Sequence, residues 1–107
     1  MACFIYITAS DKTEALAVGR TLVGERLAAC VNVLDGMTSV YWWNGKIEEA
    51  SEAVLVAKTA DGLVDRLIER VKKLHSYECP CVVSWSIEKG SEEYLQWIAD
   101  ETGSKSE

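Results

Sequence analysis

Hydrophobic and polar positions follow two different periods along this chain, and the change of period separates expected strands from expected helices. Residues 2–9 are mostly β-branched or aromatic, so alternate side chains would face opposite sides of a sheet. Residues 11–27 repeat apolar side chains at helical spacing, and Asp11 followed by Glu14 is typical of a helix start. The chain is therefore predicted to open with a strand and an amphipathic helix.

A long β-hairpin is the next predicted feature. Its first strand covers residues 29–43 and is interrupted at residues 35–36, where we expect a bulge or a bend. Asn44-Gly45 favours a two-residue turn, because both turn positions require positive φ. The return strand covers residues 46–59 and ends in a continuous apolar run.

Two helices and one strand are expected in the second half of the chain. Apolar spacing predicts a helix over residues 61–75, which Thr59 or Asp61 would cap. An extended apolar segment predicts a strand over residues 81–87. A break at residues 89–91 then leads into a short terminal helix.

The predicted order is βαββαβ with an extra C-terminal helix, and the chain contains no repeats or linkers. One domain over residues 1–107 is therefore expected, with residues 103–107 as a frayed tail. Two βαβ-type units joined by a hairpin predict an α+β, ferredoxin-like sandwich, in which a four-stranded antiparallel sheet carries helices on one face.

Aromatic residues on the sheet predict an oligomer. Trp42 and Trp43 are adjacent in a strand and must face opposite sides, but helices can cover only one side. Phe4 and Tyr6 would likewise lie opposite the core-facing side chains of the first strand. A large exposed apolar surface usually marks an interface, so we expect a homo-oligomer in which Tyr41, Trp42 and Trp43 contribute contacts. One tryptophan lying along the hairpin tip of a monomer is the alternative.

Composition and charge narrow the class of partner. Apolar residues make up 49% and charged residues 26% of the chain, which is sufficient for a packed core. A net charge of −6 argues against nucleic acid and anionic membranes as partners. The apolar N-terminal segment lacks a preceding basic region and reads as a strand, and no apolar run is long enough to span a bilayer. A cytoplasmic location is expected.

The cysteines offer limited metal chemistry. Cys3, Cys30, Cys79 and Cys81 would be buried reduced thiols in the simplest interpretation. The spacing Cys79-Pro80-Cys81 differs from the Cys-x-x-Cys of redox and zinc motifs. In a strand, residues two apart share a face, so both thiols could meet one soft metal ion.

His75 is the single histidine of the chain. With Glu78 and Cys79 it provides imidazole, carboxylate and thiolate groups that suit copper or zinc. The alternative is that His75 caps the end of the preceding helix and Glu78 is an exposed turn residue. An enzyme is not expected, since the sequence has no glycine-rich phosphate loop and no nucleophile elbow. A cysteine nucleophile with His75 as its base would lack an orienting residue.

Several segments closely resemble the CutA divalent-cation tolerance family. The resemblance spans about residues 3–102, almost the whole chain. Its motifs cover residues 6–9, 25–32, 38–49, 58–59, 74–80 and 94–98.

The resemblance implies a homotrimer whose hairpins embrace neighbouring subunits, with a role in the response to metal ions and in binding copper or other divalent cations. No cofactor is required. The alternative is a trimeric signalling or scaffold module, similar in architecture to the PII proteins, that binds a small anionic ligand at the subunit interface. The family's motif maps onto His75, Tyr77 and Pro80, in an intersubunit pocket that Lys58 and Trp43 would line.

The chain departs from the family pattern at three positions. Ser76 stands where proline commonly follows the histidine. Some members carry a metal-binding cysteine and a histidine pair where this chain has Ile7 and Leu74. Cys3 is no substitute, because four strand residues separate it from Ile7 by about 13 Å. The metal hypothesis therefore uses a different ligand set: His75, Glu78 and Cys79.

Overall fold

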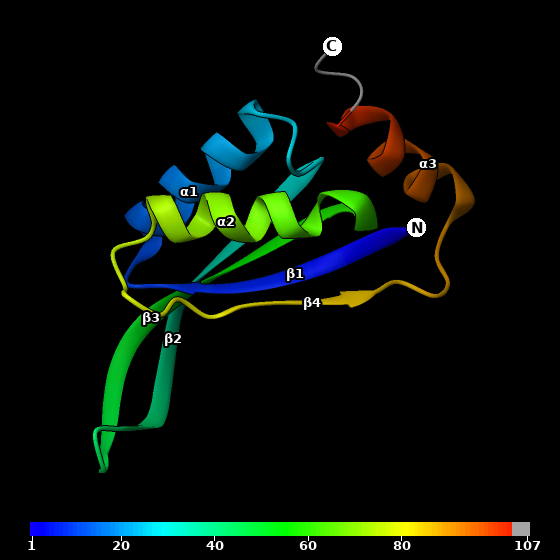
Figure 1. The fold of residues 1–107 in the computed structure, drawn as a ribbon. Helices are drawn as coiled ribbons and strands as arrows, with labels where there is room; N and C mark the ends of the chain where they lie inside the picture. The colour runs from blue at the N-terminus through cyan, green and yellow to red at the C-terminus, as the bar shows by residue number, and fades with distance from the viewer. Residues whose placement is uncertain (104–107) are drawn as a thin grey trace.

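The computed structural model describes residues 1–103 and contains the predicted sequence of elements (Figure 1). Their bounds are β1 Ala2–Ala9, α1 Lys12–Gly24, β2 Cys30–Trp43, β3 Lys46–Ala60, the short 3-10 helix η1 Asp61–Leu63, α2 Val64–Leu74, β4 Val82–Ser86 and α3 Glu92–Glu101. The sheet has the strand order β2-β3-β1-β4, and all neighbouring strands are antiparallel. The predicted α+β fold with a four-stranded antiparallel sheet is confirmed.

The core lies between the sheet and helices α1 and α2, which cover the same face (Figure 1). Ile5 and Ile7 of β1 are completely buried there, whereas Phe4 and Tyr6 on the opposite face are only half-buried. The predicted alternation along β1 is therefore confirmed. Burying one such aliphatic side chain stabilises the fold by roughly 1.5–3 kcal/mol relative to leaving it exposed. This free energy keeps the face of the sheet that carries Ile5 and Ile7 turned toward the helices.

Helix α1 begins as predicted but ends earlier. The Asp11 side chain accepts a hydrogen bond from the backbone N–H of Glu14 at 2.8 Å, which caps the helix. The helix ends at Gly24 and does not reach residue 27, because Arg26 has φ 59° and turns the chain toward β2. The Arg26 guanidinium holds this turn by donating to the carbonyl and the carboxylate of Glu101 in α3.

The second helix was predicted with the wrong cap. The chain enters it through η1, and no side chain among residues 1–103 caps η1 or α2. Asp61 instead pairs with the N-terminal ammonium of Met1 at 3.5 Å. Thr59 points into the interior from β3 and is completely buried. Asp61 is therefore used elsewhere, and the Thr59 hydroxyl has no hydrogen-bond partner among the described residues.

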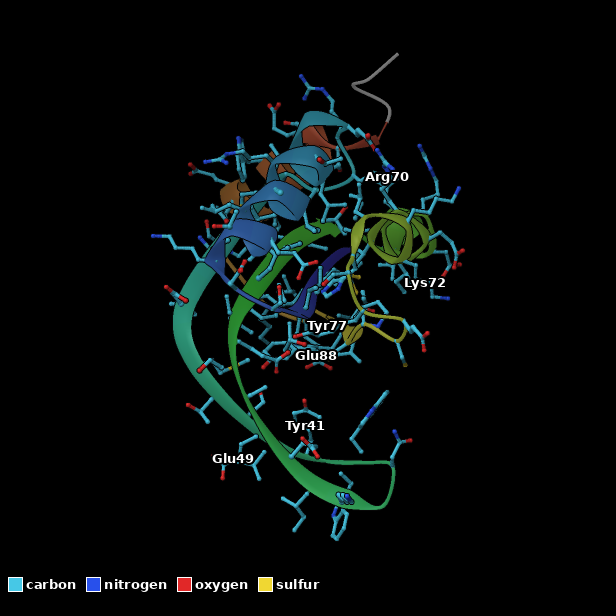
Figure 2. The ribbon with its side chains drawn as sticks, turned by 90° about the vertical axis from the view of Figure 1, so that its left-hand side faces the viewer. Tyr41, Glu49, Arg70, Lys72, Tyr77 and Glu88 are labelled. Atoms are coloured by element: carbon cyan, nitrogen blue, oxygen red, sulfur yellow. The ribbon has the colours of Figure 1, made fainter. Side chains whose placement is uncertain are left out.

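The hairpin of β2 and β3 projects beyond the rest of the sheet (Figures 1 and 2). Asn44 and Gly45 have φ 50° and 78°, which confirms the predicted turn. A register shift between Leu34 and Met37 confirms the predicted bulge. Strand β1 pairs with β3 as far as Ala53, so within residues 1–103 the outer parts of β2 and β3 pair only with each other.

Helix α3 packs across the end of the sheet next to the N-terminus (Figure 1). Ser91, the last residue of the predicted break, caps the helix by accepting a hydrogen bond from the Tyr94 N–H at 3.4 Å. Gly103, where the frayed tail was expected to begin, donates a backbone hydrogen bond to Arg26 at 3.0 Å. The remainder of that expected tail lies outside the described residues.

Candidate ligand and metal site

A pocket of about 460 Å³ lies at the base of the hairpin, between the hairpin and the segment that joins α2 to β4. Figure 2 shows Tyr77 on the body of the domain and Tyr41 on the curved hairpin below it. We call this cavity the hairpin pocket, and its lining residues are Thr8, Ser39, Tyr41, Trp43, Glu48, Glu52, Tyr77, Glu78, Cys79 and Cys81.

The bulge decides which hairpin side chains face the pocket. Before the bulge, Leu34 lies opposite Val54, whereas after it Met37 lies opposite Glu52. The parity of β2 therefore changes relative to β3, and the odd-numbered residues now share a face with Glu52. As a result Trp43 lines the pocket, and Trp42 faces the other side of the hairpin.

Tyr77 lines the pocket and is held in place by Glu52. Its hydroxyl donates a hydrogen bond to Glu52 Oε2 at 2.7 Å. Burial and then the hydrogen bond and charge of Glu52 raise the pKa of Tyr77 above its usual range. The phenol therefore keeps its proton, and Tyr77 acts in the pocket as a neutral wall and hydrogen-bond donor.

His75 positions the loop that carries Tyr77. It is buried, and its Nδ1 accepts a hydrogen bond from the backbone N–H of Tyr77 at 3.1 Å. That bond leaves the proton on Nε2, which donates to the Thr8 carbonyl at 2.6 Å. Both ring nitrogens are thus occupied. His75 also directly follows α2 as its C-terminal capping residue, and its own backbone N–H donates to the Val71 carbonyl.

Glu14 connects the same loop to the start of α1 through hydrogen bonds. The sequence had indicated Glu14 only as part of a helix start. One carboxylate oxygen accepts hydrogen bonds from the N–H and the hydroxyl of Ser10 at 2.9 and 2.8 Å. The other accepts the Ser76 N–H at 2.8 Å. Burial would raise the pKa of Glu14, but the hydrogen bonds from Ser10 and Ser76 outweigh it and lower this pKa to about 2.

The predicted metal ligands are only partly brought together. Glu78 and Cys79 both line the hairpin pocket and are exposed, but the ring nitrogens of His75 are engaged elsewhere. Across residues 1–103, no three His, Cys, Asp or Glu side chains are arranged to hold a metal ion. The structure therefore does not assemble the three predicted ligands as a ready-made site. It does place Cys81 beside the other pocket residues.

The predicted anion-binding residues are separated within one chain. Trp43 and Tyr77 line the hairpin pocket. Lys58 lies six residues from Glu52 along β3, about 20 Å away. Its ammonium donates to Asn32 Oδ1 at 2.7 Å and lies 5.8 Å from the centre of the Tyr94 ring. Lys58 can therefore meet Trp43 and Tyr77 only if a second copy of the chain supplies it.

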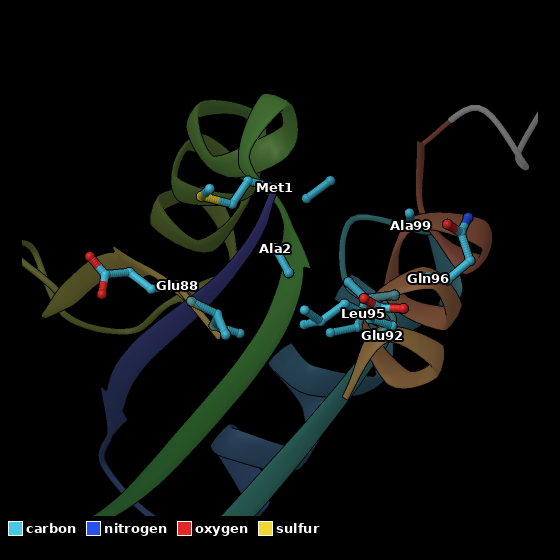
Figure 3. Close-up of a pocket in the computed structure, with 10 residues that line it drawn as sticks. Met1, Ala2, Glu88, Glu92, Leu95, Gln96 and Ala99 are labelled. Atoms are coloured by element: carbon cyan, nitrogen blue, oxygen red, sulfur yellow. The ribbon is translucent and has the colours of Figure 1, made fainter. Parts of the chain in front are cut away.

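A second pocket, of about 480 Å³, lies between the N-terminus and α3 (Figure 3). Glu88 and Glu92 are the ionisable side chains among its lining residues, and no thiol or imidazole is among them. The hairpin pocket therefore offers the richer metal and ligand chemistry.

Within residues 1–103, no helix has both the length and the apolarity needed to cross a bilayer.

Taken with the fold, this geometry places the chain in a class of small α+β domains whose polar chemistry gathers at the base of a projecting hairpin. The sequence profile described as CutA1 divalent ion tolerance protein matches residues 3–101. The chain belongs to this family.

Individual relatives agree with this assignment. The divalent-cation tolerance protein CutA of Thermus thermophilus is 42% identical over 92% of this chain and 96% of its own length. Protein CutA of Homo sapiens is 40% identical over 95% of this chain, which spans only 57% of the human protein. The chloroplastic protein CutA 1 of rice is 39% identical over 92% of this chain, which spans 55% of the rice protein.

Solved structures agree as well. The Thermus thermophilus protein superimposes with a TM-score of 0.94 at 42% identity, covering 96% of this chain and all of its own. The periplasmic divalent cation tolerance protein CutA of Archaeoglobus fulgidus gives a TM-score of 0.91 at 40% identity, covering 94% of this chain and 98% of its own. The family is named for ion tolerance and not for a reaction.

Replacing Glu14 by Gln is expected to destabilise the domain at neutral pH by about 2 kcal/mol, because one amide oxygen cannot serve both Ser10 and Ser76. The folded pKa of Glu14 is lowered from 4.5 to about 2, so its contribution is complete above pH 4.5 and is lost as the pH falls toward 2. Urea unfolding from pH 7 to pH 2.5 should therefore show the two proteins converging in acid.

The matched control for this prediction is Glu93→Gln, which alters an exposed carboxylate at the start of α3. Its free energy of unfolding should parallel that of the unmodified protein across the same pH range. A constant difference between Glu14→Gln and the unmodified protein down to pH 2.5 would show that the Glu14 charge does not stabilise the loop.

Proposed function

We propose that this protein acts in the tolerance of, and response to, metal ions by binding copper or another divalent cation in the hairpin pocket, as a cytoplasmic homotrimer that requires no other cofactor. The observation that carries the proposal is that carboxylates and thiols line one cavity: Glu48, Glu52, Glu78, Cys79 and Cys81. Thiolates select soft metals, and carboxylates add negative charge that attracts cations.

Glu78 and Cys79 are the proposed metal ligands of the predicted set. Both are exposed at the pocket, so an ion reaches them without disturbing the core. His75 would join them only after losing its hydrogen bonds to Thr8 and Tyr77. Its proposed contribution is therefore first to hold the loop that presents Glu78 and Cys79.

Exposed aromatic surface supports the proposed trimer. Trp42, Trp43 and Tyr41 are 72%, 53% and 42% exposed in the single chain. Val83 and Trp85 add apolar surface on the face of the sheet that no helix covers. Apolar surface on this scale is unusual for a soluble monomer and favours association with other copies.

A second candidate function is a trimeric signalling or scaffold module that binds a small anionic ligand between subunits. Lys58 favours it, because the ion pairs found within residues 1–103 leave its ammonium without a carboxylate partner. Lys58 of one copy would supply the positive charge, and Trp43 and Tyr77 of another would supply the walls.

Removing Glu78 and Cys79 together is expected to weaken copper or zinc binding by about tenfold or more, because both proposed ligands are lost. Equilibrium dialysis of the reduced protein in the absence of oxygen, with metal analysis of both compartments, measures this for Glu78→Gln combined with Cys79→Ser. Lys58→Ala is the control and should retain the metal. Equal, weak uptake by all three proteins would contradict a specific metal site.

Trp43→Ala is expected to weaken assembly before it affects secondary structure, because the side chain is exposed in the isolated chain. Sedimentation equilibrium should show a shift from trimer toward monomer at low concentration, with an unchanged far-ultraviolet circular dichroism spectrum. Trp97→Ala changes the same residue type on α3, away from the hairpin, and should leave assembly intact. A Trp43→Ala protein that remained a tight trimer would contradict the proposed interface.

A further inference from the structure

The outer part of the hairpin is attached to the rest of the domain at one level. We call residues 37–52 the arm, since the pairing of β1 with β3 stops at Ala53. Among residues 1–103, no ion pair and no ring contact joins the arm to the remainder of the domain. The polar attachment of the arm therefore depends on side-chain hydrogen bonds.

Two tyrosines of the domain donate these hydrogen bonds. The Tyr6 hydroxyl on β1 donates to Met37 Sδ at 3.6 Å. The Tyr77 hydroxyl donates to Glu52 Oε2 at 2.7 Å. Met37 and Glu52 face each other across the hairpin and are the first pair after the bulge. Within the part of the chain that the structure describes, these are the two side-chain hydrogen bonds between arm and domain, and together they form what we term the tyrosine clamp.

The hydrogen bond from Tyr77 is the stronger of the two. Its acceptor is a carboxylate, and charge-assisted hydrogen bonds are roughly twice as strong as neutral ones. Glu52 is also only 9% exposed, and surroundings of low polarity strengthen a hydrogen bond. The thioether of Met37, in contrast, is a weak acceptor. The Tyr77 hydroxyl is therefore the group whose removal should most affect the arm.

A weakly packed point lies directly beside the clamp. Gly36 in the bulge has φ 77°, and a side chain added there would meet nothing beyond its chain neighbours within 4 Å. Leu34, which precedes the bulge, is 61% exposed. Hinges consist of a few residues that can change their backbone angles, and sparse packing opposes such a change least. The arm can therefore turn about the bulge unless the clamp holds it.

We infer that the tyrosine clamp fixes the direction of the arm in each chain and so presents the arm correctly to a second copy of the chain. The inference rests on the proposed trimer. The arm carries Trp43, which is 53% exposed in the single chain and belongs to the proposed interface. An arm that is already fixed loses less conformational freedom when a partner binds it, so association is tighter. Tyr6 and Tyr77 are accordingly positioning residues for assembly.

Removing one hydroxyl tests the inference. The Tyr77→Phe trimer should dissociate at a protein concentration about tenfold higher than the unmodified trimer, as measured by sedimentation equilibrium. Glu52→Ala should have the same effect. A protein with both changes should dissociate no more readily than either single variant, because both changes remove the same hydrogen bond.

Further variants distinguish the clamp from a general loss of stability. Glu52→Gln should stay within about threefold of the unmodified protein, because its amide oxygen still accepts the Tyr77 hydroxyl. Tyr94→Phe is the matched control and should leave assembly unchanged, since its hydroxyl contacts Cys30 outside the arm. Amide hydrogen exchange, followed by mass spectrometry, should accelerate in residues 37–52 of Tyr77→Phe and remain unchanged in β1.

Each outcome bears on a different claim. If the unmodified protein is a trimer and Tyr77→Phe assembles equally tightly, the clamp is overturned and the proposed trimer stands. Additive effects of Tyr77→Phe and Glu52→Ala, or faster exchange throughout the chain, would overturn the clamp in the same way. An unmodified protein that stays monomeric at every concentration would overturn both the clamp and the trimer.

Discussion

The β-bulge between Leu34 and Met37 is the constraint on which the candidate site depends. By placing one more residue in β2 than in the facing part of β3, it exchanges the faces on which the outer residues of β2 lie. Gly36 adopts φ 77° there, a conformation that other residues rarely accept. Without this exchange Trp42 would face the body of the domain in place of Trp43, and the wall of the hairpin pocket would have a different composition.

The opposite wall depends on a chain of hydrogen bonds that begins at Glu14. Glu14 holds the Ser76 N–H, His75 joins Thr8 to Tyr77, and the Tyr77 hydroxyl reaches Glu52 on the hairpin. Because each bond fixes the next group, the start of α1, the end of β1 and the hairpin are linked through one short loop. This linkage presents Glu78 and the two cysteines at an open cavity instead of burying them.

Sequence alone predicted the features that local chemistry determines. Asn44-Gly45 identified the turn and Asp11 identified the start of α1, since each depends only on near neighbours. It did not predict that Thr8 and the Tyr77 N–H would occupy both nitrogens of His75, because that needs contacts between distant segments. The partnership of Glu52 with Tyr77 was missed for a related reason: the face on which Glu52 lies follows from pairing across the bulge.

Native mass spectrometry of the reduced protein, with and without stoichiometric copper, tests most directly the claim that the hairpin pocket belongs to a metal-binding trimer. The account predicts a trimer that gains a fixed number of ions, the same for each subunit. A trimer with only scattered, sub-stoichiometric adducts would contradict the metal function and favour a module that binds a small ligand between subunits. A monomer would contradict the assembly itself.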